Sequence, residues 1–187
     1  GKSLLPHTRS QGGLKVVERC FFRKGLIKMK KYYLAYGSNL NIAQMRYRCP
    51  TAKVVGTAEI QGYELLFKGS GTGAYLTIEK AKGKSVPVAV WEVGRYDELA
   101  LDRYEGYPDF YYKKEIAVEC IEIGTHRRRK VSAFVYIMHE DRRLGIPSRY
   151  YVETCLEGYR TFGFDEKKLY MAIYESRVRS DENSRAY

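Results

Sequence analysis

Between residues 51 and 93 the sequence repeats one pattern, in which a short run rich in β-branched and aromatic side chains is followed by Gly, Lys or Ser. Runs of about four to eight such residues, bounded by turn formers, are typical of β-strands. Their close spacing predicts antiparallel strands in a curved sheet or barrel. Four strands are predicted here, over residues 53–60, 63–67, 74–78 and 86–93.

The segment before these strands predicts a strand, a tight loop and a helix. Residues 32–36 (YYLAY) are aromatic-rich and short, which favours a strand, and the following Gly37-Ser38-Asn39 ends it. Asn39 or Asn41 can cap a helix that runs to about Arg48, before Pro50 stops it.

The segment after these strands alternates irregularly between helix and strand. Asp97 is expected to cap a helix over residues 98–105, with Gly106 ending it. Strands are predicted over residues 111–123 and 130–138, joined by a basic turn, and two helices follow from Ser148 and from Asp165 to about Arg177. This order indicates an α+β fold and not a doubly wound sheet.

The positive charge is concentrated near the N-terminus. The formal net charge is +11, and residues 1–28 contribute seven basic residues and one acid to it. Met29 directly precedes an apolar strand, so residues 1–28 are predicted to be an N-terminal extension, non-native or disordered. One domain is expected over residues 29–175, followed by a polar tail over residues 176–187 that frays. This distribution argues against the alternative that basic residues and 18 tyrosines bind single-stranded nucleic acid.

Several other classes of protein are disfavoured by what the sequence lacks. Its longest apolar stretches fall far short of the roughly 20 residues that a membrane helix needs. The four cysteines are widely spaced without a C-x-x-C motif, so we expect neither a disulfide framework nor a zinc site, and a cytoplasmic location. The sequence contains no P-loop, G-x-S-x-G or H-E-x-x-H motif, and its three histidines are isolated, so no metal and no cofactor is expected.

A carboxylate in an unusual place is the first candidate for chemistry. Glu105 falls in the last turn of a predicted helix, in the sequence LDRYEGYP, where the negative end of the helix and aromatic neighbours both disfavour ionisation. The pKa of Glu105 is therefore expected to be raised, as suits a residue that takes and returns a proton near neutral pH. A solvated glutamate at a helix end is the alternative.

The second candidate is the loop Tyr36-Gly37-Ser38-Asn39, which lies between a strand and a helix N-terminus. Gly37 permits close approach of the backbone, and free N–H groups there form a cradle for a carboxylate or an oxyanion. An ordinary turn with an Asn cap is the alternative interpretation.

Four ordered blocks resemble the γ-glutamylcyclotransferase-like superfamily, which includes AIG2-like proteins and γ-glutamylamine cyclotransferases. They are YLAYGSNL, VPVAVWEV, LDRYEGYP and PSRYYVETCLEG, within a match over about residues 32–175. The GSN form of the loop resembles the cyclotransferase branch more than the γ-glutamylamine enzymes.

The resemblance implies a small mixed β-barrel with flanking helices, and an enzyme that cyclises a small-molecule γ-glutamyl amide to 5-oxoproline. It assigns Glu105 as general base and acid, and it places Tyr151, rather than the adjacent Tyr150, in the pocket because Gly158 then falls at the family spacing. A γ-glutamylamine cyclotransferase and a noncatalytic binding module remain alternatives. The substrate-binding residues that it implies are Tyr33, Leu34, Ala35, Tyr36, Gly37, Ser38, Asn39 and Tyr151.

Overall fold

The computed structural model describes residues 30–70 and 73–185, so the predicted N-terminal extension lies outside the described residues. The elements follow the predicted order of strand, helix, strands, helix, strands and helices. They are β1 (Lys31–Ala35), the 3-10 turn η1 (Ser38–Leu40), α2 (Ile42–Arg48), β2 (Lys53–Ser70), β3 (Gly73–Val93), α3 (Arg95–Glu105), β4 (Tyr111–Glu122), β5 (Arg128–Met138), β6 (Arg143–Leu144), α4 (Arg149–Phe162) and α5 (Glu166–Arg185).

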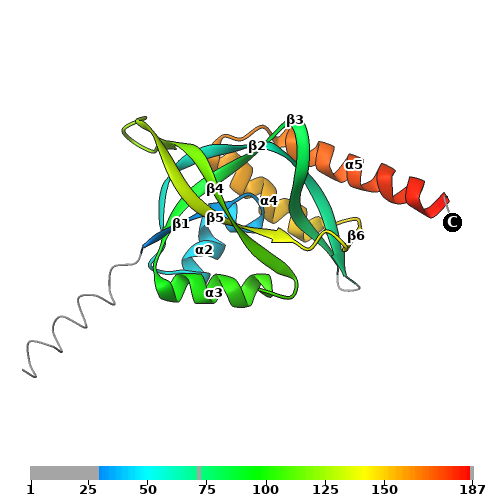
Figure 1. Ribbon diagram of the computed structural model, residues 1–187, viewed down its shortest axis with the longest axis horizontal. Coiled ribbons are helices and arrows are strands. Elements are labelled where there is room, and N and C mark those ends of the chain that lie inside the picture. Colours follow the sequence, from blue (N-terminus) through cyan, green and yellow to red (C-terminus); the bar gives the residue numbers. More distant parts are fainter. Residues whose placement is uncertain (1–29, 71–72, 186–187) are drawn as a thin grey trace, which may run out of the picture.

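The strands form one mixed sheet that closes into a barrel (Figure 1). β1 pairs antiparallel with β3 and parallel with β5, and β4 lies between β5 and β2. The ring closes because β2 and β3 also pair with each other, while the short β6 adds to β2. Closure removes the unpaired edges that an open sheet would expose. The predicted α+β fold, a small mixed barrel with flanking helices, is confirmed.

The four strands predicted between residues 53 and 93 are two long, bent strands. β2 runs through Gly62, which has a φ of +76° and lies at a shift in the register between Gln61 and Tyr63. Gly83, at a φ of +79°, lies opposite in β3. Glycine inside a strand permits a bulge and a bend without ending the pairing. Two of the three predicted turns are therefore bends within the long strands, and the third lies between β2 and β3.

α3 begins earlier than predicted, and the prediction that Asp97 is its N-cap is wrong. Gly94 occupies the N-cap position, and Asp97 lies in the first turn, where its carboxylate accepts a hydrogen bond from the Gly94 N–H at 3.0 Å. A carboxylate at the third position of a helix can accept a hydrogen bond from the backbone N–H of the N-cap residue, which has no partner within the helix. Gly106, at a φ of +65°, ends α3 as predicted, so Glu105 is its last residue.

The helices α2 and α4 are capped by predicted residues, and α4 packs closely against η1. Asn41, one of the two predicted caps, accepts from the Gln44 N–H at the start of α2. Ser148 caps α4 as predicted, and Gly158 lets α4 approach η1, since a Cβ there would lie 2.3 Å from the Leu40 Cβ.

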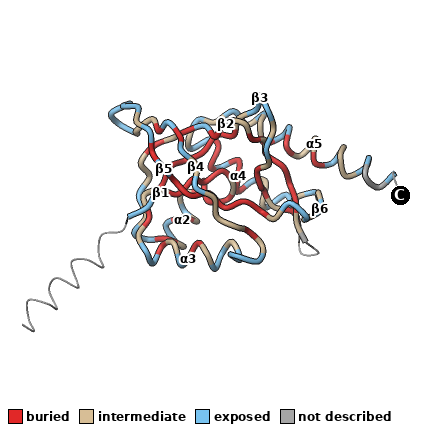
Figure 2. The backbone as a smooth tube through the Cα atoms, in the orientation of Figure 1, coloured by how far each residue is buried: buried red, intermediate tan, exposed pale blue. Residues whose placement is uncertain are grey.

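The last helix is longer than predicted. α5 continues to Arg185, past the predicted end at Arg177. Ser176, where the polar tail was predicted to begin, is fully buried, and its Oγ accepts from the Phe67 N–H at 2.8 Å. Figure 2 shows buried residues along the barrel strands and α4, and exposed residues towards the far end of α5. The burial of Ser176 explains why a mainly polar sequence continues as helix here.

Candidate active site

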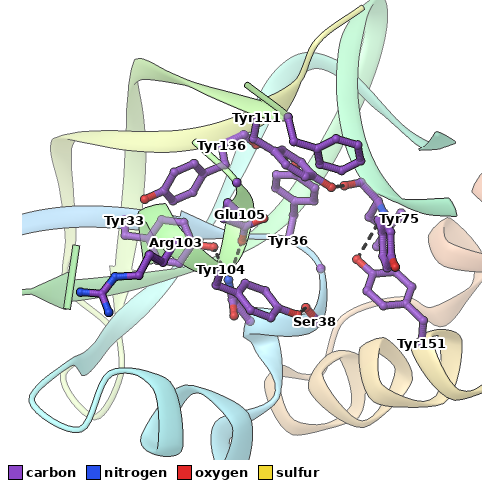
Figure 3. A pocket seen from close by; sticks show the side chains of 15 residues that line it. Tyr33, Tyr36, Ser38, Tyr75, Arg103, Tyr104, Glu105, Tyr111, Tyr136 and Tyr151 are labelled. Carbon is purple, nitrogen blue, oxygen red and sulfur yellow. Dashed lines mark hydrogen bonds between the residues drawn. The ribbon is translucent and has the colours of Figure 1, made fainter. Parts of the chain in front are cut away.

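A pocket of about 440 Å³ opens between the β1–η1 loop, the end of α3, strands β3 to β5 and α4 (Figure 3). This volume lies in the range of about 300–1,000 Å³ that is typical of small-molecule sites. The structure brings together residues that the sequence analysis selected from three distant segments. The predicted site residues that line the pocket are Tyr33, Tyr36, Gly37, Ser38, Asn39, Glu105 and Tyr151.

Glu105 is the acidic residue among those that line the pocket, and its pKa is raised from 4.5 to about 7. Burial among the surrounding rings is the main cause, and the charge of Arg48 and a hydrogen bond from Asn39 offset part of it. The residue as a whole is only partly buried, so its carboxyl remains reachable from the pocket. A carboxyl with a pKa near 7 can both accept and donate a proton at neutral pH. The predicted upward direction is confirmed.

Asn39 connects the loop to Glu105. Its Nδ2 atom donates to the Glu105 Oε1 atom at 2.9 Å and to the Tyr33 hydroxyl at 2.9 Å. Its Oδ1 atom accepts from Arg48, at the end of α2. The Arg48 guanidinium lies over the Tyr104 ring, 3.4 Å from its centroid. This arrangement joins β1, the loop, α2 and α3 around one carboxyl group.

The other side of the loop contacts Tyr151. A Cβ at Gly37 would lie 3.1 Å from the Tyr151 hydroxyl, so a larger residue there would press on this side chain. The Tyr151 hydroxyl accepts from the Leu76 N–H at 3.2 Å, which fixes it to β3. The adjacent Tyr150 is 77% exposed and does not line the pocket.

Two residues of the predicted substrate loop lie elsewhere. Leu34 and Ala35 are fully buried in the core and are not among the residues that line the pocket. Their neighbours Tyr33 and Tyr36 do line it. The motif therefore contains residues that lie only in the core and residues that also line the pocket.

The sequence analysis missed the aromatic wall of the pocket. Tyr111 and Tyr136 fall in strands that were correctly predicted, but the face of each strand was not assigned. Alternation along a strand is the signal that could have found them. The remaining lining residues are Tyr75, Leu76, Arg103, Tyr104, Gly106, Phe110, Tyr111 and Tyr136.

Burial divides these rings into a floor and a mouth. The floor (Tyr33, Tyr36, Tyr111 and Tyr136) is buried, and burial raises the pKa of each of these hydroxyls above its ordinary value, so the floor stays uncharged. The mouth (Tyr75, Tyr104 and Phe110) is half-buried or exposed. Figure 3 shows Glu105 beside Tyr33 and Tyr104, and Tyr75 with Tyr151 at the opposite end. A ligand would therefore enter past aromatic rings and meet Glu105 inside.

The cysteines of the described residues and the basic β4–β5 turn lie outside the pocket. Cys49, Cys120 and Cys155 are buried free thiols. Within residues 30–70 and 73–185 no helix is long and apolar enough to cross a membrane. In the same residues no three His, Cys, Asp or Glu side chains are grouped as metal ligands would be. In the basic β4–β5 hairpin, Arg128 and Arg129 form ion pairs with glutamates of β4.

Comparisons with known proteins point to one family. The family model described as "Gamma-glutamyl cyclotransferase, AIG2-like" matches residues 33–155. The gamma-glutamylcyclotransferase of Homo sapiens is 29% identical over 113 residues, which are 57% of this chain and 58% of that protein. The chain thus matches little more than half the length of its curated relatives.

Solved structures show the same fold. One named "Gamma-glutamyl cyclotransferase" superposes with a TM-score of 0.65 at 25% identity, covering 74% of this chain and 84% of that one. YkqA from Bacillus subtilis superposes with a TM-score of 0.61 at 18% identity, covering 88% of this chain and 58% of that one, and this likeness concerns the fold alone.

Proposed function

Because the chain belongs to the gamma-glutamyl cyclotransferase, AIG2-like family, we propose that it cyclises a γ-glutamyl amide to 5-oxoproline and releases an amine or amino acid. The observation that carries this proposal is Glu105, a carboxyl group with a pKa of about 7 that lines the pocket beside the glycine loop. The reaction needs one group that first removes a proton and later returns it.

Glu105 begins the proposed reaction as the base. Its carboxylate takes a proton from the α-ammonium group of the γ-glutamyl substrate, and the freed nitrogen attacks the γ-carbonyl carbon. A carbon–nitrogen bond forms and closes a five-membered ring, while the carbonyl oxygen gains negative charge. Holding both reacting atoms of one γ-glutamyl group in a folded shape supplies much of the rate acceleration.

Glu105 ends the proposed reaction as the acid. The oxyanion collapses back to a carbonyl, the bond to the leaving nitrogen breaks, and Glu105 returns its proton to that nitrogen. The ring nitrogen is positively charged after the attack and gives up a second proton, which Glu105 accepts and passes to the released amine. The products are 5-oxoproline and an ammonium ion, so the protons balance within the site. Backbone N–H groups of Gly37, Ser38 and Asn39 are proposed to stabilise the oxyanion, since the first N–H groups of a helical turn have no partner within the turn.

The division into floor and mouth suggests how the substrate lies. The γ-glutamyl group is proposed to occupy the floor, where Glu105 and the loop meet, and the leaving amine to extend towards Tyr75 and Phe110 at the mouth. The half-buried rings there leave apolar surface exposed to the part of the substrate that departs. We place the reaction in the cytoplasm, in keeping with the cysteine pattern of the sequence.

The test is detection of 5-oxoproline by mass spectrometry after the full chain is incubated with γ-glutamyl amino acids, γ-glutamyl-lysine amines and glutathione. We expect product from one of these classes, and product formation at least about 10²-fold slower with Glu105→Gln. Binding of the same compounds without product, equal in both proteins, would replace the proposal with a noncatalytic binding module.

A further inference from the structure

Arg48 is close to the proposed catalytic group but does not line the pocket. It lies at the end of α2, where its guanidinium donates to the Asn39 Oδ1 atom and stacks 3.4 Å from the centroid of the Tyr104 ring. Cation–π contacts extend to about 6 Å, so this stack is a close one. Arg48 is thereby fixed between the loop and α3.

This contact decides which way the Asn39 amide faces. A guanidinium has hydrogen-bond donors and no acceptor, so the amide atom that meets Arg48 must be the oxygen. The NH₂ group of Asn39 is then left facing Glu105 and Tyr33, at 2.9 Å from each oxygen. An NH₂ group can only donate, and a donor stabilises the ionised form of a carboxyl group.

The other polar groups around Glu105 are mostly neutral phenols. Arg103 also lines the pocket, but its guanidinium points away from Glu105 (Figure 3). Among the described residues, Arg48 is the cation whose charge acts on the Glu105 carboxyl. The phenols that surround it come from β1 and the loop after it, α3, β4, β5 and α4, and they are Tyr33, Tyr36, Tyr104, Tyr111, Tyr136 and Tyr151.

We propose that Arg48 is a positioning residue, which locks the Asn39 amide with its NH₂ group towards Glu105 and so keeps the Glu105 carboxylate available as a base. Without Arg48 the amide is free to turn, and an amide oxygen facing Glu105 would favour the protonated carboxylic acid. The role of Arg48 in turnover rests on the proposed function. Its effect on the proton affinity of Glu105 does not.

The test is a ¹³C NMR titration of the Glu105 side-chain carboxyl in the full chain without substrate, assigned by difference from Glu105→Gln. The parent midpoint is expected near 7. In Arg48→Met we expect the midpoint to rise by about one unit or more, because both the charge and the amide lock are lost. Methionine keeps a long side chain and a high helix propensity, so α2 should persist.

Two variants control this result. Arg46 lies on the same helix but is exposed, so Arg46→Met removes the same charge from α2 and should leave the midpoint unchanged. Arg48→Lys keeps the charge but loses the planar fork, and should leave a midpoint between those of the parent and Arg48→Met. If Arg48→Met does not fold by circular dichroism, Arg48→Gln replaces it, with an upward shift again expected.

The outcomes separate the two proposals. An unchanged midpoint in the folded Arg48 variants, or an equal shift in Arg46→Met, would overturn the positioning role. If the variants turn over substrate, the acid limb of kcat/KM should move with the NMR midpoint, whereas a purely structural role would lower kcat/KM equally at every pH. Absence of 5-oxoproline from all proteins, with the NMR shift present, would refute the proposed function alone.

Discussion

The two ends of α3 each hold a glutamate, and the two have opposite proton affinities. The pKa of Glu98, in the first turn, is lowered from 4.5, whereas the pKa of Glu105, at the last position, is raised to about 7. The two residues are seven positions apart, so they lie on nearly the same face of one helix. Helix face and residue type are therefore shared, and the surroundings make the difference.

Burial raises the pKa of both glutamates. Of the two, only Glu98 is bonded directly to cations of the described residues, and these reverse the effect of burial. Glu98 accepts from Lys113 at 2.6 Å and forms an ion pair with Lys31 at 2.9 Å, which together outweigh its burial. Glu105 instead accepts from the neutral Asn39 amide, and the cation lies behind that amide. Arg48 acts through the intervening amide and offsets only part of the effect of burial, so the pKa of Glu105 stays raised.

The largest expected effect is on kcat, which should fall when Glu105 is replaced but not when Glu98 is. Glu105→Gln should lower kcat by about 10²- to 10⁴-fold, the usual contribution of a general acid–base group. Glu98→Gln, the matched change at the other end of α3, should keep kcat within a few fold because Glu98 does not line the pocket. Initial rates of 5-oxoproline release measure both. Equal losses in the two variants would show that the integrity of α3, and not Glu105 chemistry, controls turnover.

The next effect concerns the pH dependence of the free energy of unfolding, to which the two glutamates should contribute in opposite directions. Between pH 4.5 and about 7 the folded chain keeps a proton on Glu105 that the unfolded chain has released, so Glu105 lowers stability as pH rises through this window. Glu105→Gln should therefore gain stability over the parent with rising pH, by at most about 3 kcal/mol because solvent screens a partly exposed group. Urea unfolding at acid and at mildly alkaline pH gives the difference.

Glu98→Gln should behave in the opposite way. The lowered pKa of Glu98 contributes stability above its ordinary value of 4.5, and this is lost as pH falls through the folded value. This variant should be less stable than the parent at neutral pH and approach it in acid. Parallel pH profiles for the two variants would contradict the proposed difference between the ends of α3.

A smaller effect is expected when the cation at the first end is removed. Lys113 pairs with Glu98 at 2.6 Å and with Asp102 at 2.7 Å, and all three side chains are partly buried. Lys113→Met should cost about 1–3 kcal/mol of unfolding free energy, between the values for exposed and buried pairs. The NMR midpoint of Glu105 should stay within a few tenths of a unit. A shift as large as that expected for Arg48→Met would show that the two ends are coupled.

Local sequence predicted the end of α3 well. Gly106 stops the helix, and the strand–loop–helix unit around Gly37 follows from residues that are adjacent in the chain. Glu105 and the loop could therefore be selected as candidates before their distances were known, whereas Tyr151 was selected only through the family resemblance. The aromatic wall could not, because the face that Tyr111 and Tyr136 present depends on the register of β4 on β5, and a slip of one residue would reverse it.

The arrangement of Arg48, Asn39 and Tyr104 around Glu105 also depends on tertiary packing. Arg48 was read only as a helix end, since nothing local indicates that it reaches Asn39 and the Tyr104 ring. The bends of β2 and β3 were read as turns because a glycine in a bulge and a glycine in a turn look alike in sequence. The pairing of β2 with β3 distinguishes them, since it continues on both sides of Gly62, from Gln61 with Ser85 to Tyr63 with Lys80.

The smallest expected effect tests whether the ring or the hydroxyl of Tyr104 supports the arrangement at the C-terminal end of α3. Tyr104→Phe removes the hydroxyl that contacts the Ser38 Oγ atom at 3.0 Å but keeps the ring beneath Arg48. Loss of one partly exposed hydrogen bond should raise KM about threefold or less. The Glu105 midpoint should not move, because the stacked guanidinium still faces Asn39.

Tyr104→Leu is the matched change, since it removes the ring as well. It should raise the Glu105 midpoint, by less than Arg48→Met, because Arg48 loses its support but keeps its charge. A midpoint raised as much by Tyr104→Phe as by Tyr104→Leu would mean that the hydroxyl, and not the ring, holds this end of α3 in its working arrangement. Arg48 would then act on Glu105 through Ser38 and the loop. The difference from Glu98, which pairs directly with its cations, would depend on the Tyr104–Ser38 hydrogen bond and not on the stacking of Arg48 on the Tyr104 ring.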